Sequence, residues 1–132
     1  MTHVETRFEL VFPVADVKLF INANDRTHWR VRHRKTKHWR GVAKLMASSA
    51  RNRGGLPLME RAAITVWFTF PTLHRRDVAN LYPTAKALLD GVVDAGVLPD
   101  DNDKHVLGPD CRREPGKGPL SMRMVFEPLD PS

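Results

Sequence analysis

The chain contains a single cysteine, Cys111, among its 132 residues. One cysteine cannot form an internal disulfide, which argues against a small secreted scaffold and favours a reducing, cytoplasmic setting. No apolar run reaches the roughly 18 residues typical of a membrane-spanning helix. The N-terminal residues MTHVETRFEL include acids and no apolar stretch, so we expect no signal peptide.

Internal repeats and low-complexity stretches are also absent. Hydrophobic residues make up 42% of the chain and charged residues 27%, which is ordinary for a globular protein. A chain of this length can bury a core without disulfides. We therefore expect one domain over residues 1–132.

Acidic residues are missing from one long segment. Between Arg26 and Arg53 there are ten Lys or Arg and three of the six His, but no Asp or Glu. The whole chain carries a net charge of +6 and has a pI near 10.0. The charge is uneven, because 15 basic and 5 acidic residues precede Asp77, whereas 6 basic and 10 acidic residues follow from it onward. A pI of this size suggests a polyanionic partner such as a nucleic acid.

Hydrophobic periodicity and breaker residues predict an α+β fold. We expect a small mixed sheet of about four strands, with two main helices packed on one face. The strands are expected at residues 6–12, 62–70, 105–107 and 120–126. The helices are expected from Thr36 to the Gly54-Gly55 pair, and from Pro83 to Ala95. Residues 21–40 are predicted as a basic loop, residues 108–119 as a second loop, and residues 127–132 as a frayed tail.

The basic segment and a following Arg pair are the candidate contacts to nucleic acid. Lys and Arg bind phosphates by releasing counterions, and a flat aromatic side chain such as Trp29 or Trp39 can stack on an unpaired base. The alternative is a solvated loop and helix face, with Trp39 in the core. The candidate residues are Arg26, Arg30, Arg32, Arg34, Lys35, Lys37, Arg40, Arg75 and Arg76.

Six aspartates lie between positions 77 and 103, and they are candidate ligands for a hard divalent ion such as Mg²⁺. Phosphodiester hydrolysis needs such a metal to generate hydroxide and to stabilise the leaving oxygen. The alternative is that these acids form ordinary turns and a solvated helix face. They are Asp77, Asp90, Asp94, Asp100, Asp101 and Asp103.

Lys86 lies one helical turn before Asp90, so the two side chains are expected on the same helix face. A lysine there can meet a scissile phosphate or protonate a leaving group. The alternative is a surface ion pair that contributes little to stability.

Residues 75–106, RRDVANLYPTAKALLDGVVDAGVLPDDNDKHV, resemble the core of RusA-type Holliday junction resolvases. The shared features are an Arg-rich turn, an aspartate followed by Asn-Leu, a helix with a lysine, a terminal Ala-Gly, and an Asp-Asp pair before a strand. The resemblance implies a homodimer that cleaves branched DNA by paired cuts. It also implies Mg²⁺ as the cofactor, with Mn²⁺ able to substitute.

The resemblance assigns roles by motif position. Asp77 matches the first metal-binding aspartate, Asp101 the downstream one, and Lys86 the catalytic lysine. The second aspartate of the motif is Ala79 here, and a methyl group cannot ligate a metal. Asp90, Asp100 or Asp103 can supply the missing carboxylate.

The sequence thus predicts a Mg²⁺-dependent, structure-specific endodeoxyribonuclease, with its metal-site core at residues 75–106. It is expected in the cytoplasm of a bacterial or phage-infected cell. Two other functions stay open. One is a junction-binding protein with weakened or no catalysis, and the other is a nonspecific nucleic-acid-binding module.

Overall fold

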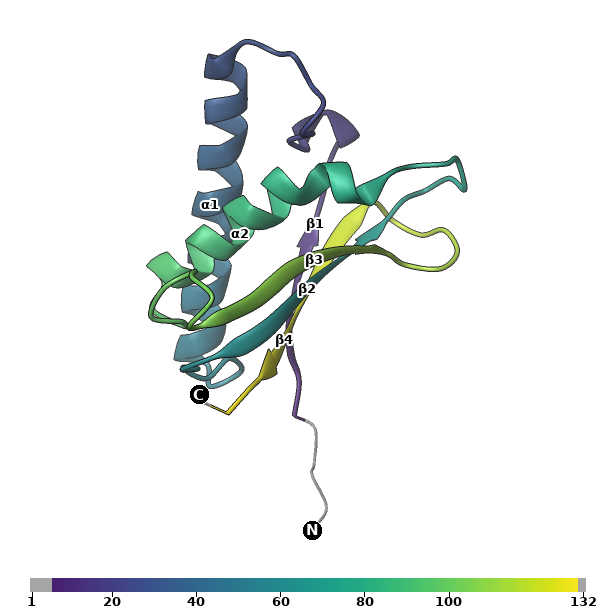
Figure 1. Cartoon of the computed structure of the whole chain (residues 1–132). Coiled ribbons are helices and arrows are strands. Elements are labelled where there is room, and N and C mark those ends of the chain that lie inside the picture. The colour runs from purple at the N-terminus through teal and green to yellow at the C-terminus, as the bar shows by residue number, and fades with distance from the viewer. Residues whose placement is uncertain (1–5, 131–132) are drawn as a thin grey trace.

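The structure is a computed structural model that describes residues 6–130. This part of the chain folds into four strands, two α-helices and two short 3-10 helices (Figure 1). Their bounds are β1 Phe8–Pro13, η1 Val17–Leu19, α1 Trp29–Asn52, β2 Ala62–Thr69, η2 Val78–Leu81, α2 Tyr82–Asp94, β3 Val106–Arg113 and β4 Ser121–Pro128.

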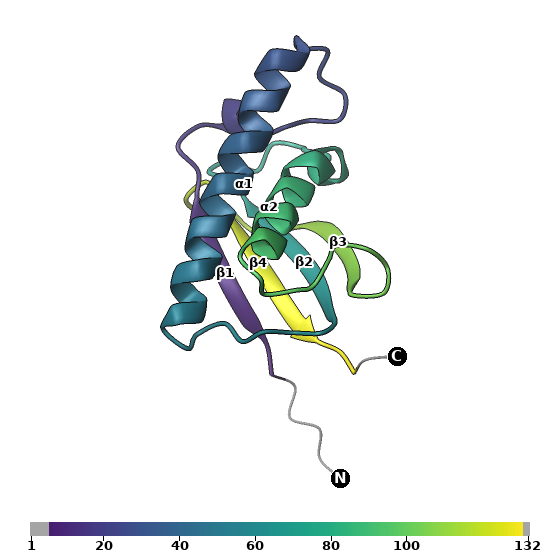
Figure 2. The ribbon, with the colours of Figure 1, turned by 90° about the vertical axis from the view of Figure 1, so that its left-hand side faces the viewer.

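The strands form one mixed sheet in the order β1-β4-β2-β3. β4 pairs antiparallel with both β1 and β2, whereas β2 pairs parallel with β3. The parallel pair requires a crossover, and η2 with α2 provides it. Both α-helices cover the same face of the sheet (Figure 2). The predicted α+β fold, with a small mixed sheet and two helices on one face, is therefore confirmed.

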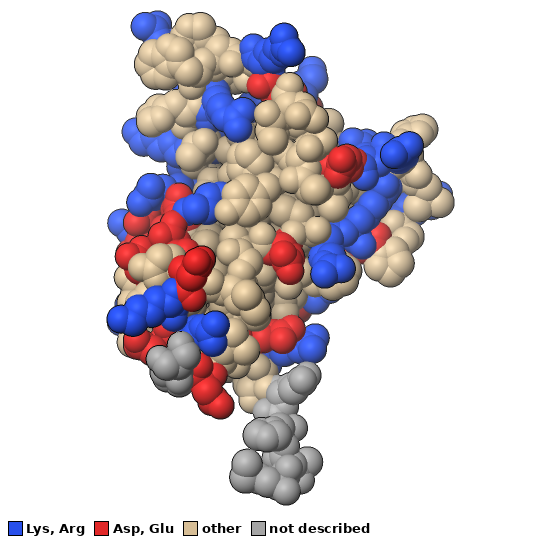
Figure 3. Space-filling model, in the orientation of Figure 1, with Lys and Arg blue, Asp and Glu red and all other residues tan. Residues whose placement is uncertain are grey.

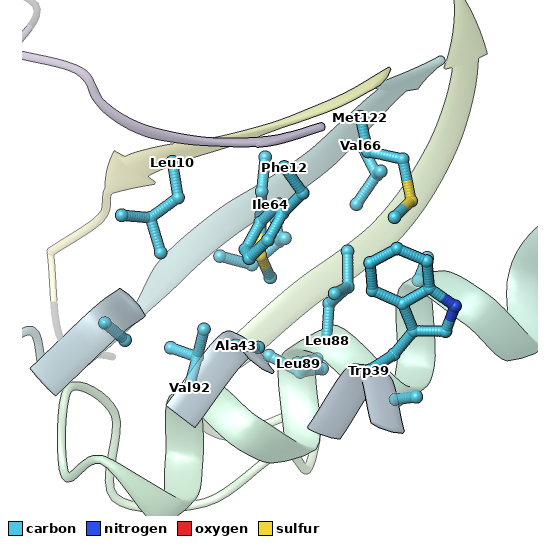
Figure 4. Close-up of a cluster of buried hydrophobic side chains, with 14 of the residues drawn as sticks. Leu10, Phe12, Trp39, Ala43, Ile64, Val66, Leu88, Leu89, Val92 and Met122 are labelled. Carbon is cyan, nitrogen blue, oxygen red and sulfur yellow. The ribbon is translucent and has the colours of Figure 1, made fainter. Parts of the chain in front are cut away.

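The core lies between the sheet and the two helices (Figure 4). Every second residue of β2 is buried, including Ile64, Val66 and Phe68, as the apolar alternation predicted. Trp39 of α1 is 2% exposed and Leu88 of α2 is fully buried. Trp39 therefore belongs to the core, and the alternative interpretation of this residue was the right one.

The two helices come very close to each other at Gly91 of α2. A Cβ atom placed on Gly91 would lie 2.8 Å from the Cβ of Ala43 and 2.9 Å from the backbone N of Lys44. Real Cβ atoms do not approach other atoms so closely, so only glycine fits at this crossing. The small residues at this point set the distance between α1 and α2.

The predicted basic loop over residues 21–40 is wrong in its second half, because α1 begins at Trp29 and not at Thr36. The sequence has no apolar period here because polar side chains hold this part of the helix against the segment that precedes it. Arg32 donates to the backbone O of Asn22 at 3.3 Å, and Lys35 donates to that of Phe20 at 3.3 Å. Cations thus replace the apolar side chains that usually mark a helix face.

Two expectations near the C-terminus were also wrong. β3 continues through residues 108 and 109 to Arg113, although a loop was predicted there. It is an edge strand, where proline is tolerated, and its register with β2 shifts between Ala63 and Thr65. The tail is bound and not frayed as far as residue 129, because β4 reaches Pro128 and the N–H of Leu129 donates to Arg61 at 2.8 Å. Residues 131 and 132 lie outside the described residues.

Candidate functional site

Lys86 holds two carboxylates that come from different parts of the chain. Its Nζ donates to Asp90 Oδ1 at 2.6 Å and also to Asp101 Oδ2. Lys86 and Asp90 lie one turn apart on α2, as predicted, whereas Asp101 comes from the loop after the helix. We call these three residues the lysine–carboxylate cluster.

The cluster is partly shielded from water, with each side chain 26% to 35% exposed. Burial lowers the pKa of Lys86, but the hydrogen bonds to Asp101 and Asp90 outweigh burial, so its pKa is raised overall. The hydrogen bond from Lys86 lowers the pKa of Asp101 in turn. The shifted pKa values of Lys86 and Asp101 both favour the charged forms of these two groups at neutral pH.

The loop after α2 fixes the position of Asp101. The Asp101 N–H donates to Asp100 Oδ1 at 2.8 Å, and Asn102 Nδ2 donates to Asp100 Oδ2 at 3.3 Å. The backbone O of Asn102 accepts from the N–H groups of His105 and Val106, each at 2.9 Å. Asp100 thus has the turn-forming role that was considered as the alternative to metal binding.

Arg40 of α1 pairs with an acid beside this cluster instead of projecting freely. Its guanidinium donates to Asp94 at 2.6 Å and 2.9 Å in a two-point contact. The pKa of Arg40 is raised, first by the hydrogen bond to Asp94, with smaller contributions from the charges of Asp90 and Asp101. Figure 3 shows acidic side chains gathered around the end of α2 and the loop that follows it.

Asp77 lies at a different place, in a cleft of about 380 Å³. Its side chain accepts from the N–H of Ala79 at 3.2 Å and begins η2. None of the three residues of the lysine–carboxylate cluster lines this cleft. The lining residues are Val17, Lys18, Phe20, Asn22, Asp25, Lys35, Phe70, Arg76, Asp77, Asn80 and Leu81.

Contacts between distant segments build the walls of this cleft. Thr84 Oγ1, at the start of α2, accepts from the N–H of Ile21 at 2.8 Å and donates to its carbonyl at 3.1 Å. The N–H of Ala23 donates to the carbonyl of Asn80 at 2.7 Å. The segment after η1 is therefore tied to the start of α2, with the cleft beside it.

Cations dominate the polar lining of the cleft. Lys18, Lys35 and Arg76 face two carboxylates, Asp25 and Asp77. The Arg76 guanidinium lies 4.4 Å from the Phe70 ring centroid, and its buried Nε has no hydrogen-bond partner within residues 6–130. A cleft lined by three cations and two carboxylates has a net positive charge and suits a phosphate group.

Sequence analysis missed two of these charged residues, Lys18 and Asp25. A signal for Asp25 was present, since it is the single acid between Asp16 and Glu60. Lys18 carried no signal, because its place in the cleft depends on how the segment after β1 folds back. Arg113 was missed as well. It donates to the carbonyls of His74 and Thr72 at 2.6 Å and 2.9 Å, and so holds the segment that carries Arg75 and Arg76.

The predicted DNA-binding residues divide into free and engaged cations. Within residues 6–130, the side chains of Arg26, Arg34, Lys37 and Arg75 make no hydrogen bond or ion pair, and all four residues are exposed. The engaged cations are Arg32, Lys35, Arg40 and Arg76, whose contacts are given above, and Arg30, whose guanidinium lies 5.5 Å from the Trp29 ring centroid. The free cations are the ones available to phosphates.

The predicted metal ligands are not gathered in one place. Within the part of the chain that the structure describes, no three His, Cys, Asp or Glu side chains lie together as metal ligands do. Mg²⁺ prefers carboxylate oxygens as ligands. The carboxylates of Asp90 and Asp101 both bind the same positive group, the Lys86 ammonium. This pair therefore fits a hard cation in its chemistry, with the Lys86 ammonium now lying between the two carboxylates.

No protein-family model and no curated protein matches the chain. Among solved structures, it has a weak likeness to the thiamine-monophosphate kinase from Stenotrophomonas maltophilia K279a, with 16% identity and a TM-score of 0.31. The alignment covers 93% of this chain and 30% of the kinase, so the chain spans less than a third of that protein. A likeness this weak carries no argument.

None of the helices within residues 6–130 has the length and apolar character needed to cross a membrane.

Proposed function

We propose that the protein is a structure-specific DNA endonuclease of RusA type, which cuts branched DNA such as Holliday junctions as a homodimer. Two features of one small domain carry the proposal. Free cations lie on α1, and Lys86 of α2 is hydrogen-bonded to one carboxylate of the same helix and to one of the following loop. Free cations suit the phosphates of the DNA arms. A lysine beside carboxylates suits chemistry at one phosphate.

In this proposal the DNA is held from two sides. Arg26, Arg34 and Lys37 bind phosphates of the arms, because no carboxylate of the described residues neutralises them. Arg75 and Arg76 lead a phosphate toward the cleft that contains Asp77. Arg76 lines that cleft, and a charge-assisted hydrogen bond from a guanidinium to phosphate is stronger than a neutral one.

Asp90 and Asp101 are the carboxylates proposed to hold Mg²⁺ or Mn²⁺, with Asp100 beside them and Asp77 as the further predicted ligand. A bound ion of this kind supplies Lewis-acid chemistry, by activating water and by stabilising charge on the phosphate oxygens. Asp90 and Asp101 would hold the cation, and the Lys86 ammonium beside them would be the group that donates to the phosphate, which would place positive charge where negative charge develops.

Cleavage of a synthetic four-way junction with Mg²⁺ or Mn²⁺ tests the proposal. Asp101→Asn and Lys86→Met are each expected to slow cleavage by about 100-fold or more, the size usual for one electrostatic catalytic group. Asp110→Asn is the control, because this exposed residue of β3 is not a candidate ligand and its side chain makes no hydrogen bond or ion pair within residues 6–130. Equal cleavage in Asp101→Asn and Asp110→Asn would contradict the assignment.

Asp77→Asn tests whether Asp77 in the cleft and the lysine–carboxylate cluster bind the same metal ion. If Asp77 and Asp101 ligate the same ion, each variant abolishes the rise in melting temperature that Mn²⁺ causes. If they do not, only Asp101→Asn abolishes it. Asp77→Asn then weakens DNA binding or cleavage without affecting binding of the metal.

A junction-binding protein without catalysis is the second candidate, and Ala79 is the observation that favours it. Ala79 stands where the RusA motif has a carboxylate, two residues after Asp77. This candidate predicts tight binding of junctions and no cutting with either metal. Ala79→Asp is then expected to create cleavage, whereas a wild-type site that is already complete predicts little gain.

A further inference from the structure

Trp29, the first residue of α1, is left on the surface. Its side chain is 66% exposed, whereas Trp39 is 2% exposed. Trp67, the third tryptophan, is partly buried on the sheet under the Arg123 guanidinium. An exposed tryptophan leaves a large apolar ring in water, and tryptophan is a residue that binding sites use.

The position of the Trp29 ring is set by its neighbours. His28 caps α1, since its Nδ1 accepts from the N–H of Arg30 at 3.1 Å. The His28 ring lies 5.6 Å from the Trp29 ring, tilted by 31°, and the Arg30 guanidinium lies 5.5 Å from its centroid. Two neighbouring groups therefore lie near the ring, while 66% of the Trp29 side chain stays exposed.

The charge around Trp29 selects its partner. Arg26 and Arg34 carry free guanidinium groups near this end of the helix, and no Asp or Glu occurs from Arg26 to Arg53. The start of α1 stands clear of α2 and of the sheet (Figures 1 and 2). An apolar groove of another protein would leave these cations without partners. A nucleic acid strand provides a flat base for the ring and phosphates for the cations.

We propose that Trp29 is a stacking platform for an unpaired nucleobase, with the free cations Arg26 and Arg34 binding the phosphates beside that base. The inference rests on the proposed function for its ligand, which is DNA. It adds the contact that distinguishes branched or single-stranded DNA from duplex. In a closed duplex each base is stacked on its neighbours and has no face to offer, whereas a branch point or a single strand has such bases.

Binding without divalent metal tests the proposal, since cleavage then cannot interfere. The probes are a fully paired, blunt-ended duplex stem, a single-stranded oligo-dT, and a four-way junction with one unpaired 2-aminopurine at its centre. Trp29→Ala is expected to weaken binding of the single strand and of this junction by about 5- to 150-fold, the range for loss of one stacked base. Binding of the duplex stem is expected to stay within about twofold.

The variants Trp29→Phe and Leu45→Ala are the controls. Phenylalanine keeps a stacking ring and is expected to retain most of the affinity. Leu45 is 73% exposed on the same helix, so its loss removes apolar surface without an aromatic ring. Quenching of 2-aminopurine by the wild type, but not by Trp29→Ala, would show the stack directly.

Equal loss of affinity by Trp29→Ala on all three probes would overturn the proposal, as would no loss on any. A failure of the proposed endonuclease function has a different signature. In that case the junction stays uncut in Mg²⁺ and Mn²⁺, while the stacking difference between the probes is still measured.

Discussion

At the scale of single residues, Lys86 joins two aspartates by hydrogen bonds. Its two hydrogen bonds go to acids from a helix and from a loop, so the cluster stabilises the join between α2 and the segment before β3. The pKa of Asp101 is lowered in the folded protein, first by the hydrogen bond from Lys86. The stability of this join therefore depends on pH.

The sign of the dependence follows from the direction of the shift. A carboxyl with a lowered folded pKa contributes its full stability above its unfolded pKa, near 3.9, and loses that contribution as pH falls through the folded pKa. We expect Asp101→Asn to unfold at lower urea concentration than the wild type at about pH 7, and the difference to shrink toward about pH 3. Asp103→Asn should show no such change. A difference between wild type and Asp101→Asn that is independent of pH would contradict the role of the ion pair.

The residue scale also shows what the sequence can predict of the site. The spacing of Lys86 and Asp90 placed them on one helix face, and the structure confirms their contact. The arrival of Asp101 at the same lysine depends on the loop after α2, whose conformation has no periodic signal. Asp25 and Asp77 share a cleft although 51 positions separate them in the chain, and such a meeting depends on tertiary folding.

At the scale of elements, β2 and α2 were predicted within about one residue of their observed ends because their patterns have a single period. The start of α1 was missed because Arg32 and Lys35 attach it through hydrogen bonds to backbone carbonyls. The start of β3 was predicted, but its continuation beyond residue 107 was missed because glycine and proline usually indicate a loop. In an edge strand with a register shift they are tolerated.

The crossing of α1 and α2 gives a prediction at this scale. Gly91→Ala would place a methyl group within 3 Å of Ala43 Cβ and of the Lys44 backbone N, so the helices must separate. The strain of overpacking is about 1–3 kcal/mol and exceeds the gain in helix propensity of at most about 1 kcal/mol. We therefore expect a lower free energy of unfolding, measured with urea.

Gly41→Ala is the matched control for this prediction. Gly41 also lies inside a helix, but a Cβ there would meet no atom within 4 Å. This variant is expected to stabilise the protein by about 0.5–1 kcal/mol, because alanine loses less backbone entropy than glycine. A stabilising effect of both substitutions would show that the helices are not in close contact at Gly91.

At the scale of the whole molecule, the uneven charge of the sequence places cations and acids on different parts of the surface. Three of the four free cations lie at or just before the start of α1. The acids gather at the end of α2, where Arg40 and Lys86 partly neutralise them (Figure 3). Free cations release counterions when they bind phosphate, but a cation already paired with a carboxylate adds less. Binding of DNA should therefore depend on salt through the start of α1.

The double variant Arg34→Gln/Lys37→Gln tests this division. If each side chain binds one phosphate, the slope of log K against log salt for duplex DNA should become shallower by about 1.8. The slope is measured by fluorescence anisotropy between about 50 and 200 mM salt. Lys117 is an exposed residue of the loop between β3 and β4, and Lys117→Gln should leave the slope unchanged.

Arg40→Gln should change the slope less than Arg34→Gln or Lys37→Gln alone, because Asp94 already neutralises Arg40. An equal change in slope for Arg40→Gln and for Arg34→Gln would show that the ion pair of Arg40 opens when DNA binds.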